Sequence, residues 1–325
     1  MELVNLEKKE RPKIKFDFLF SAHSNAEDAK KLKDKIKECD VYAPEFTYGK
    51  VPEDVLKKAF KDLSEGLIDP DVFINLLAQH DTRTSFLLQE YDFFKVLLES
   101  IYKSEKKILS IDLSDKEMLK IVESGDPDLQ NKVYQLRNIP SSFIQLAKQG
   151  NIEAALNKFK IYLETLVKIN IQAREKIVLQ KLKKELDILI ENDPKLKMNP
   201  EIKVLVSFGS AHTSLGHTLQ KEGYNVEREF NKMPYIYSIS HEIVRRMMFN
   251  KEIPEGAYKQ GLAEMMIVSL LIKANREKST EEVFSTVRKF ISSLSVSEID
   301  ELLKDIKNQQ TKKILDRIYN FTSKA

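Results

Sequence analysis

The sequence predicts an α/β fold: an open, mostly parallel or mixed sheet flanked by helices, with long helical insertions and an all-helical C-terminal region. Short apolar runs alternate with helical patterns over the first 230 residues, which is typical of a sheet covered by helices. Only 9 Gly and 10 Pro occur in 325 residues, whereas sandwiches and barrels need frequent turns. No strand pattern follows Met233, where the chain becomes a series of amphipathic helical patterns.

The N-terminal region has the pattern of a strand–helix–strand unit. The aromatic and apolar run Lys15–Phe20 predicts the first strand, and Asn25–Lys37 predicts a helix with its apolar residues on one face. Asp40–Glu45 predicts the second strand. Because the whole unit takes about 30 residues, we expect the two strands to be parallel neighbours.

Helical patterns then interrupt the alternation twice. Glu53–Ser64, Pro70–Gln79 and Thr84–Lys103 predict helices in a first insertion. The run KILSID over Lys107–Asp112 predicts the next strand. A second helical tract follows it, in which Ile152–Leu189 predicts one or two long helices, and it ends at Asn-Asp-Pro and Asn-Pro sequences.

The clearest strand of the chain is Ile202–Phe208, a continuous apolar run suited to a central parallel strand. Ser214–Glu222 predicts a short helix closed by Gly223, and Tyr224–Phe230 predicts a further strand. The C-terminal region predicts helices over Ala257–Asn275, Thr280–Ser293 and Ser297–Phe321.

These patterns predict two parts. Residues 1–230 form an α/β domain with insertions at about 50–105 and 114–195. Residues 231–325 form a helical region, separate or packed as a lid, through which the chain could oligomerise.

Composition excludes several classes of protein. The single Cys39 rules out an internal disulfide framework and a cysteine-based zinc site. With 53 basic and 50 acidic residues the net charge is +3, so we expect neither a nucleic-acid nor a membrane partner. The charged N-terminus and the short apolar runs predict a cytoplasmic protein. The sequence contains no phosphate-binding loop, dinucleotide fingerprint or serine-hydrolase elbow.

Polar residues follow the predicted strands where each one ends. His23 follows the first strand, Glu45 ends the second, Asp112 ends the third and His212 follows the fourth. Ends of parallel strands share one edge of a sheet, where ligands bind. Imidazole and carboxylate suit Mn, Co or Zn, so His23, Glu45 and His212 form a candidate metal site. Such a metal could supply a bound hydroxide as nucleophile.

Each of these residues also has a purely structural interpretation. A histidine at a strand end can be a hydrogen-bonded surface or half-buried residue. Glu45 could be a solvated loop acid, and Asp112 could cap the helix that follows it. Arg174 and Glu175 could lie side by side on a solvated helix face.

Several short motifs together resemble those of a known superfamily. The run VLVSFGSAHTSLGHTLQKEGYNV, in which His212 ends a G-x-x-H motif, resembles the second histidine block of the TraB/TIKI and erythromycin-esterase/ChaN-like superfamily. His23 in FSAH and Glu45 in APEF match its first histidine motif and its glutamate. Arg174, in the run AREK, matches an arginine that precedes an acid in a long helix. The resemblance spans about residues 15–230, and it departs at Phe20, where the family usually has Gly.

The resemblance implies an α/β fold with an active site at the strand ends. Members include metal-dependent proteases, macrolide esterases and haem-binding proteins. By this likeness His23, Glu45 and His212 would bind metal or act in acid–base chemistry, and Arg174 would pair with Glu45 or hold a carbonyl or oxyanion. The resulting expectation is a hydrolase, assisted by Mn, Co or Zn, that acts on a small molecule or a peptide.

A second hypothesis belongs to another class: a non-catalytic α/β scaffold, or a protein that binds partners or a ligand such as haem. Phe20 in place of Gly and the large helical share of the chain favour it. The enzyme hypothesis expects His23, Glu45 and His212 to line one pocket. The scaffold hypothesis expects them to be scattered or buried in separate hydrogen bonds.

Overall fold

The fold is that of a computed structural model, in which the chain forms two compact units. One is an α/β unit of residues 1–115, 177–208 and 215–230, and the other is a helical unit of residues 116–176, 209–214 and 231–325. The described residues are 11–21, 26–46, 49–81, 92–123, 139–230, 238–254, 256–274, 280–308 and 310–323.

The α/β unit contains a five-stranded parallel sheet, which confirms the predicted fold class. Its strand order is β3-β2-β4-β1-β5. The sequence predicts that the first two strands of the chain are neighbours, and this prediction is wrong, because β4 lies between them. The strands are β1 (Lys13–Ser21), β2 (Val41–Pro44), β3 (Lys107–Ile108), β4 (Glu201–Gly209) and β5 (Asn225–Phe230).

Strand β3 is much shorter than the predicted run Lys107–Asp112. It pairs with β2 at the edge of the sheet, and Leu109 donates one more hydrogen bond to the Tyr42 carbonyl at 2.8 Å. The backbone then turns at Asp112, whose Oδ1 accepts the Leu113 N–H at 2.8 Å. This local hydrogen bond competes with strand pairing, as aspartate commonly does.

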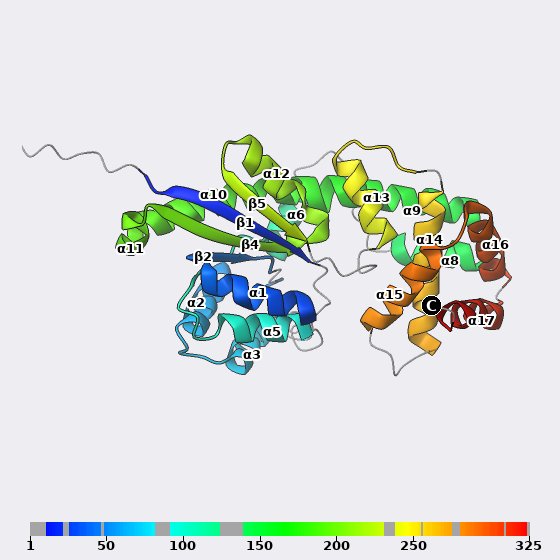
Figure 1. The fold of residues 1–325 in the computed structure, drawn as a ribbon, viewed down its shortest axis with the longest axis horizontal. Helices are drawn as coiled ribbons and strands as arrows, with labels where there is room; N and C mark the ends of the chain where they lie inside the picture. Colours follow the sequence, from blue (N-terminus) through cyan, green and yellow to red (C-terminus); the bar gives the residue numbers. More distant parts are fainter. Residues whose placement is uncertain are drawn as a thin grey trace, which may run out of the picture. The chain divides into compact units, whose positions relative to one another are not determined.

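Four helices cover one face of the sheet (Figure 1). Their apolar side chains form one core with Leu19, Tyr42 and Leu205 from the strands. The helices are α1 (Ala26–Glu38), α2 (Glu53–Ser64), α3 (Pro70–His80) and α5 (Asp92–Ile101). The predicted helix Thr84–Lys103 is described only from residue 92 onward.

The opposite face is aromatic. Phe16, Phe18 and Phe20 alternate along β1, so they share one side of the sheet, and all three are buried. Helix α12 (Ser214–Lys221) lies close to this side, because a Cβ on its Gly216 would stand 3.3 Å from Phe18. Helix α10 (Arg174–Asn192) is also on this side (Figure 1).

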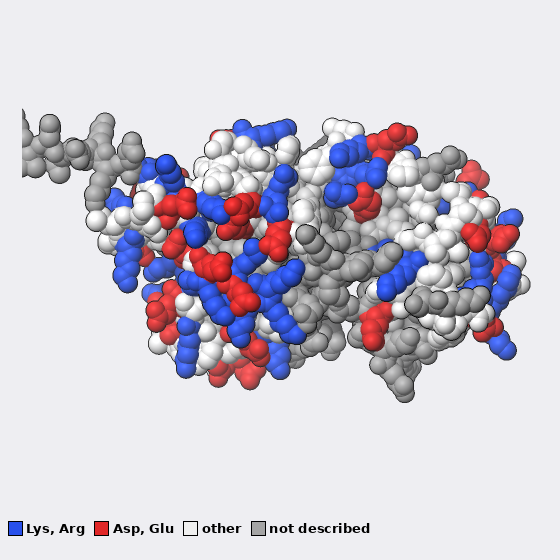
Figure 2. All heavy atoms as spheres, in the orientation of Figure 1, with Lys and Arg blue, Asp and Glu red and all other residues white. Residues whose placement is uncertain are grey.

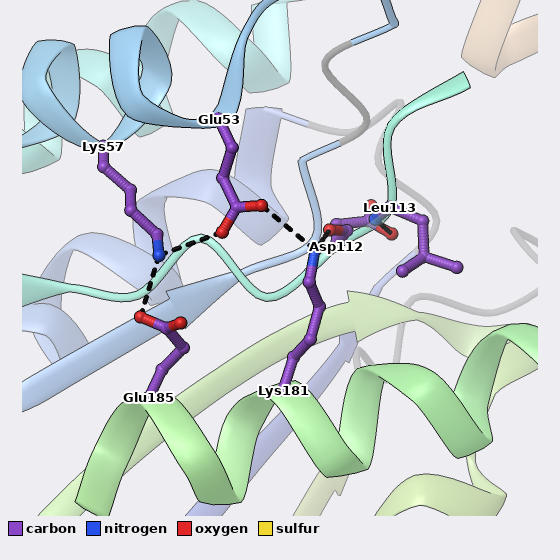
Figure 3. A network of polar contacts seen from close by, with 6 residues as sticks. All are labelled: Glu53, Lys57, Asp112, Leu113, Lys181 and Glu185. Carbon is purple, nitrogen blue, oxygen red and sulfur yellow. Dashed lines mark hydrogen bonds and ion pairs between the residues drawn. The ribbon is translucent and has the colours of Figure 1, made fainter. Parts of the chain in front are cut away.

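Charged side chains of α2 and α10 meet around the edge strand β3. The Lys57 ammonium lies 2.9 Å from both Glu53 and Glu185, and Figure 3 marks both contacts with dashed lines. The Lys181 ammonium lies 3.8 Å from Glu53 and donates to the Asp112 carbonyl at 3.1 Å. We call these five residues the β3 edge network. It joins α2 to α10 beside the segment that follows β3.

The helical unit has a core of its own. Phe159 of α9 (Ile152–Leu166) packs against Gly261 of α14 (Ala257–Ala274), where an added Cβ would stand 3.1 Å from the ring. The short helix α11 (Pro194–Met198) belongs to the α/β unit. The other helices that the structure describes are α6 (Asp115–Glu123), α8 (Ile139–Lys148), α9 (Ile152–Leu166), α13 (Ile239–Met248), α14 (Ala257–Ala274), α15 (Thr280–Ser292), α16 (Val296–Lys307) and α17 (Thr311–Thr322).

Two features of this unit differ from the sequence predictions. Residues 116–176 pack with residues 231–325, whereas the sequence places them in the α/β domain. The predicted helix Ser297–Phe321 is two helices, α16 and α17. Ion pairs from Lys313 at 2.8 Å and Arg317 at 3.5 Å to the buried Asp305 join α17 to α16 across the turn.

The visible surface of the α/β unit carries acidic and basic side chains interspersed (Figure 2), in keeping with the small net charge of +3. Within the described part of the chain, every helix is too short or too polar to cross a membrane.

Candidate functional site

His212 lies at the point where the central strand β4 ends. A 3₁₀-helix, η2 (Ser210–His212), follows β4 directly, and only 6% of His212 is exposed to solvent. Helix α13 packs against η2. A histidine held this deep needs partners for both ring nitrogens.

Two consecutive residues of α10 supply those partners. The Arg174 Nη1 lies 3.1 Å from Nε2 of His212, and the Glu175 Oε1 lies 3.1 Å from Nδ1. A guanidinium can only donate, so Nε2 of His212 accepts and Nδ1 carries the proton. The imidazole is therefore neutral in this arrangement, with its Nδ1–H directed at the carboxylate.

Ser214 completes the group. Its hydroxyl donates to the second oxygen of Glu175, which is itself buried. We call Arg174, Glu175, His212 and Ser214 the His212 cluster. All four belong to the helical unit.

A π-helix directly precedes Arg174 and Glu175, the two residues of α10 that contact the His212 ring. The segment η1 (Val167–Ala173) is a π-helix that ends immediately before Arg174. Short π-helical turns interrupt α-helices frequently at functional sites. Here the wider turn precedes the two side chains that contact opposite nitrogens of His212.

The structure brings together two of the four predicted site residues. Arg174 and His212 are hydrogen-bonded, whereas Glu45 belongs to the α/β unit, and His23 lies outside the described residues. Glu45 is half-buried after β2, and its backbone N–H donates to the Ser207 carbonyl at 2.7 Å.

The arrangement around His212 does not fit a metal ligand, because Arg174 directs a donor at Nε2 and the proton on Nδ1 faces Glu175. Among the described residues, no group of three or more His, Cys, Asp or Glu side chains could hold a metal ion. The set of His23, Glu45 and His212 stays a prediction.

Phe20, at the position where the resembling family has Gly, is part of the sheet core. Its ring stacks on Phe18 at a centroid distance of 5.6 Å and on Phe230 at 5.1 Å. The side chain is fully buried. An aromatic residue at this position therefore stabilises the pairing of β1 with β5.

A buried ion pair in the same unit has no counterpart among the predicted residues. Glu264 of α14 accepts from Arg288 of α15 at 2.7 Å, and its other oxygen accepts the Ile239 N–H at 2.8 Å. Burial raises the pKa of Glu264, while the charge of Arg288 opposes that shift. The sequence contains an indication of this buried carboxylate, since Glu264 is the only acid in the apolar run from Leu262 to Leu271.

Comparisons with protein-family models, with curated proteins and with solved structures found no match to this chain.

Proposed function

We propose that the protein is a hydrolase in which Glu175 and His212 activate a water molecule and Arg174 binds the oxygen of a scissile carbonyl. The observation that carries this proposal is the buried chain of contacts from Arg174 through His212 to Glu175, at 3.1 Å each. A neutral histidine backed by a carboxylate is the arrangement that general-base catalysis requires.

Arg174 gives the site two states. Without substrate, its guanidinium occupies the lone pair of His212 Nε2. A substrate carbonyl that takes over this N–H would leave Nε2 able to accept a proton. Substrate binding and activation of the base are then the same event.

The chemistry follows from these positions. Nε2 of His212 removes a proton from water as the water oxygen attacks the carbonyl carbon. The C=O electron pair moves onto oxygen, where Arg174 stabilises the negative charge. Glu175 stabilises the imidazolium, which then returns its proton to the leaving oxygen or nitrogen as the acyl bond breaks.

The metal-assisted version of this hydrolase is a separate proposal that depends on His23 and Glu45. Elemental analysis of the purified protein tests it. Stoichiometric manganese, cobalt or zinc would support it, and no bound metal together with no affinity for these ions would remove it. The proposed reaction uses no metal at His212, because the contacts of its ring nitrogens do not fit a metal ligand.

Turnover of p-nitrophenyl esters and of a fluorogenic peptide tests the metal-free proposal. We expect His212→Ala to lower kcat/KM by at least about 100-fold, the usual contribution of a general base. His80→Ala, at the exposed end of α3, is the matched control and should keep full activity. Absence of turnover by the natural chain, or equal activity of the folded His212→Ala protein, would contradict the proposal.

The scaffold hypothesis also has a specific observation in its favour. His212 is almost fully buried, and both of its ring nitrogens already have protein partners. In that case the His212 cluster only fixes η2 to the Arg174–Glu175 pair. The same variants separate the two hypotheses, because a scaffold would lose stability on substitution and never turn over a substrate.

A further inference from the structure

The first turn of α13 places a second histidine in the neighbourhood of His212. His241 is the third residue of α13, and this helix packs against both η2 and the π-helix η1. The site residues on those elements are His212 itself and the Arg174–Glu175 pair that follows η1 directly. Solvent reaches the His241 side chain.

A capping box fixes the tautomer of His241. The Ser238 hydroxyl accepts the His241 backbone N–H at 3.0 Å, and the His241 Nδ1 accepts the Ser238 backbone N–H at 3.4 Å. Since Nδ1 is an acceptor, the proton of the neutral ring is on Nε2. His241 therefore presents an N–H donor, the reverse of His212, whose Nε2 is an acceptor.

The surroundings keep this ring neutral. Desolvation by the surrounding protein lowers the pKa of His241, and the positive charge of Arg288 lowers it further. Arg288 is anchored by the buried Glu264, which also accepts the N–H of Ile239 at the start of α13. Glu242, on the same helix, is engaged by Arg245 at 2.6 Å and Arg246 at 2.8 Å.

We propose that His241 is the second catalytic histidine of the hydrolase site, where its Nε2–H donates to the substrate oxygen that also contacts Arg174. A neutral imidazole suits this role because it can donate without being titrated. The inference rests on the proposed hydrolase function. It assigns one histidine as base and the other as donor, from the hydrogen bonds that fix their opposite tautomers.

Kinetics of the full chain with p-nitrophenyl butyrate test this role. We expect His241→Ala to lower kcat by about 100-fold, the usual effect of removing one oxyanion donor. His241→Gln retains an N–H donor near the position of Nε2 and should recover most of the rate. His80→Ala serves again as the control histidine and should leave kcat unchanged.

The outcomes distinguish the two proposals. If the natural chain hydrolyses the ester and His241→Ala, folded by circular dichroism, keeps its kcat, the role of His241 is overturned and the hydrolase proposal stands. If the natural chain has no activity, both fall.

NMR of nitrogen-15 histidine-labelled protein adds a readout that is independent of turnover. We expect the His241 resonances of a ring protonated on Nε2 at pH 7. A His241 ring protonated on Nδ1 would overturn the assignment of His241 as the donor.

Discussion

The β3 edge network and the His212 cluster use similar side chains in very different surroundings. In the network, the side chains of Lys57 and Glu53 are 38% and 39% exposed. In the cluster, those of His212 and Glu175 are 7% and 8% exposed. Water screens the pair of Lys57 with Glu53, so this ion pair contributes little. In the His212 cluster each hydrogen bond replaces one to water. Loss of one partner leaves a buried polar group unsatisfied, which lowers the free energy of unfolding.

This difference separates a surface ion-pair network from a candidate site. The network joins α2 to α10 through long side chains, and ion pairs of this kind tolerate substitution. The cluster fixes an imidazole tautomer through two partners at 3.1 Å. Buried polar groups with fixed protonation are more typical of catalysis than of surface stabilisation.

The buried ion pair of Glu264 with Arg288 should show the largest effect on stability. Glu264→Ala leaves Arg288 buried without its carboxylate, so we expect the free energy of unfolding to fall by about 3–5 kcal/mol. Urea denaturation measures it. The double variant Glu264→Leu with Arg288→Met removes both charges and should be far less destabilised. A loss below about 1 kcal/mol for Glu264→Ala would show that water reaches the pair.

The His212 cluster should be intermediate. Glu175→Ala removes the acceptor of both His212 and Ser214, and we expect a loss of about 1–3 kcal/mol in the free energy of unfolding. The same variant should lower the proposed esterase activity, since the imidazolium loses its carboxylate. Glu185→Ala, on the same helix but in the β3 edge network, is the matched control. Equal effects of the two variants on stability would contradict a difference between the buried His212 cluster and the β3 edge network.

The β3 edge network should give the smallest effect. Lys57→Met breaks the ion pairs to Glu53 and Glu185 but keeps most of the apolar stem, so we expect a loss of less than about 1 kcal/mol. Thermal unfolding measures it, and 1 M NaCl should reduce the difference from the natural chain because salt screens exposed charges. A salt-independent loss larger than this would place the network among the buried clusters.

The sequence predicts the parallel sheet well because strand patterns are local. The continuous apolar run of β4 and the alternation in β1 both follow from which faces are buried. The strand order is less predictable, since β4 inserts between β1 and β2 from more than 150 residues further along the chain. Likewise, the packing of residues 116–176 with the C-terminal helices depends on contacts such as Phe159 with Gly261.

The candidate site is predictable in part for the same reason. The place of His212 follows from a local rule, that polar residues gather at the ends of parallel strands. The pairing of His212 with Glu175 spans 37 residues, and sequence periodicity contains no information about it. The proposed role of His241 is equally unpredictable from the sequence, because it depends on the packing of α13 against η2.

The π-helix η1 makes the cluster tolerant of one change in chain length. In an ordinary α-helix, deletion of one residue turns every later side chain by about 100° around the helix axis. A π-helical turn holds roughly one residue more than an α-helical turn, so a residue deleted between positions 167 and 173 would let this segment return to α-helical winding with Arg174 and Glu175 still facing the imidazole. A related chain one residue shorter here would therefore keep the site, and a purely α-helical segment at this point does not exclude a relative that shares it.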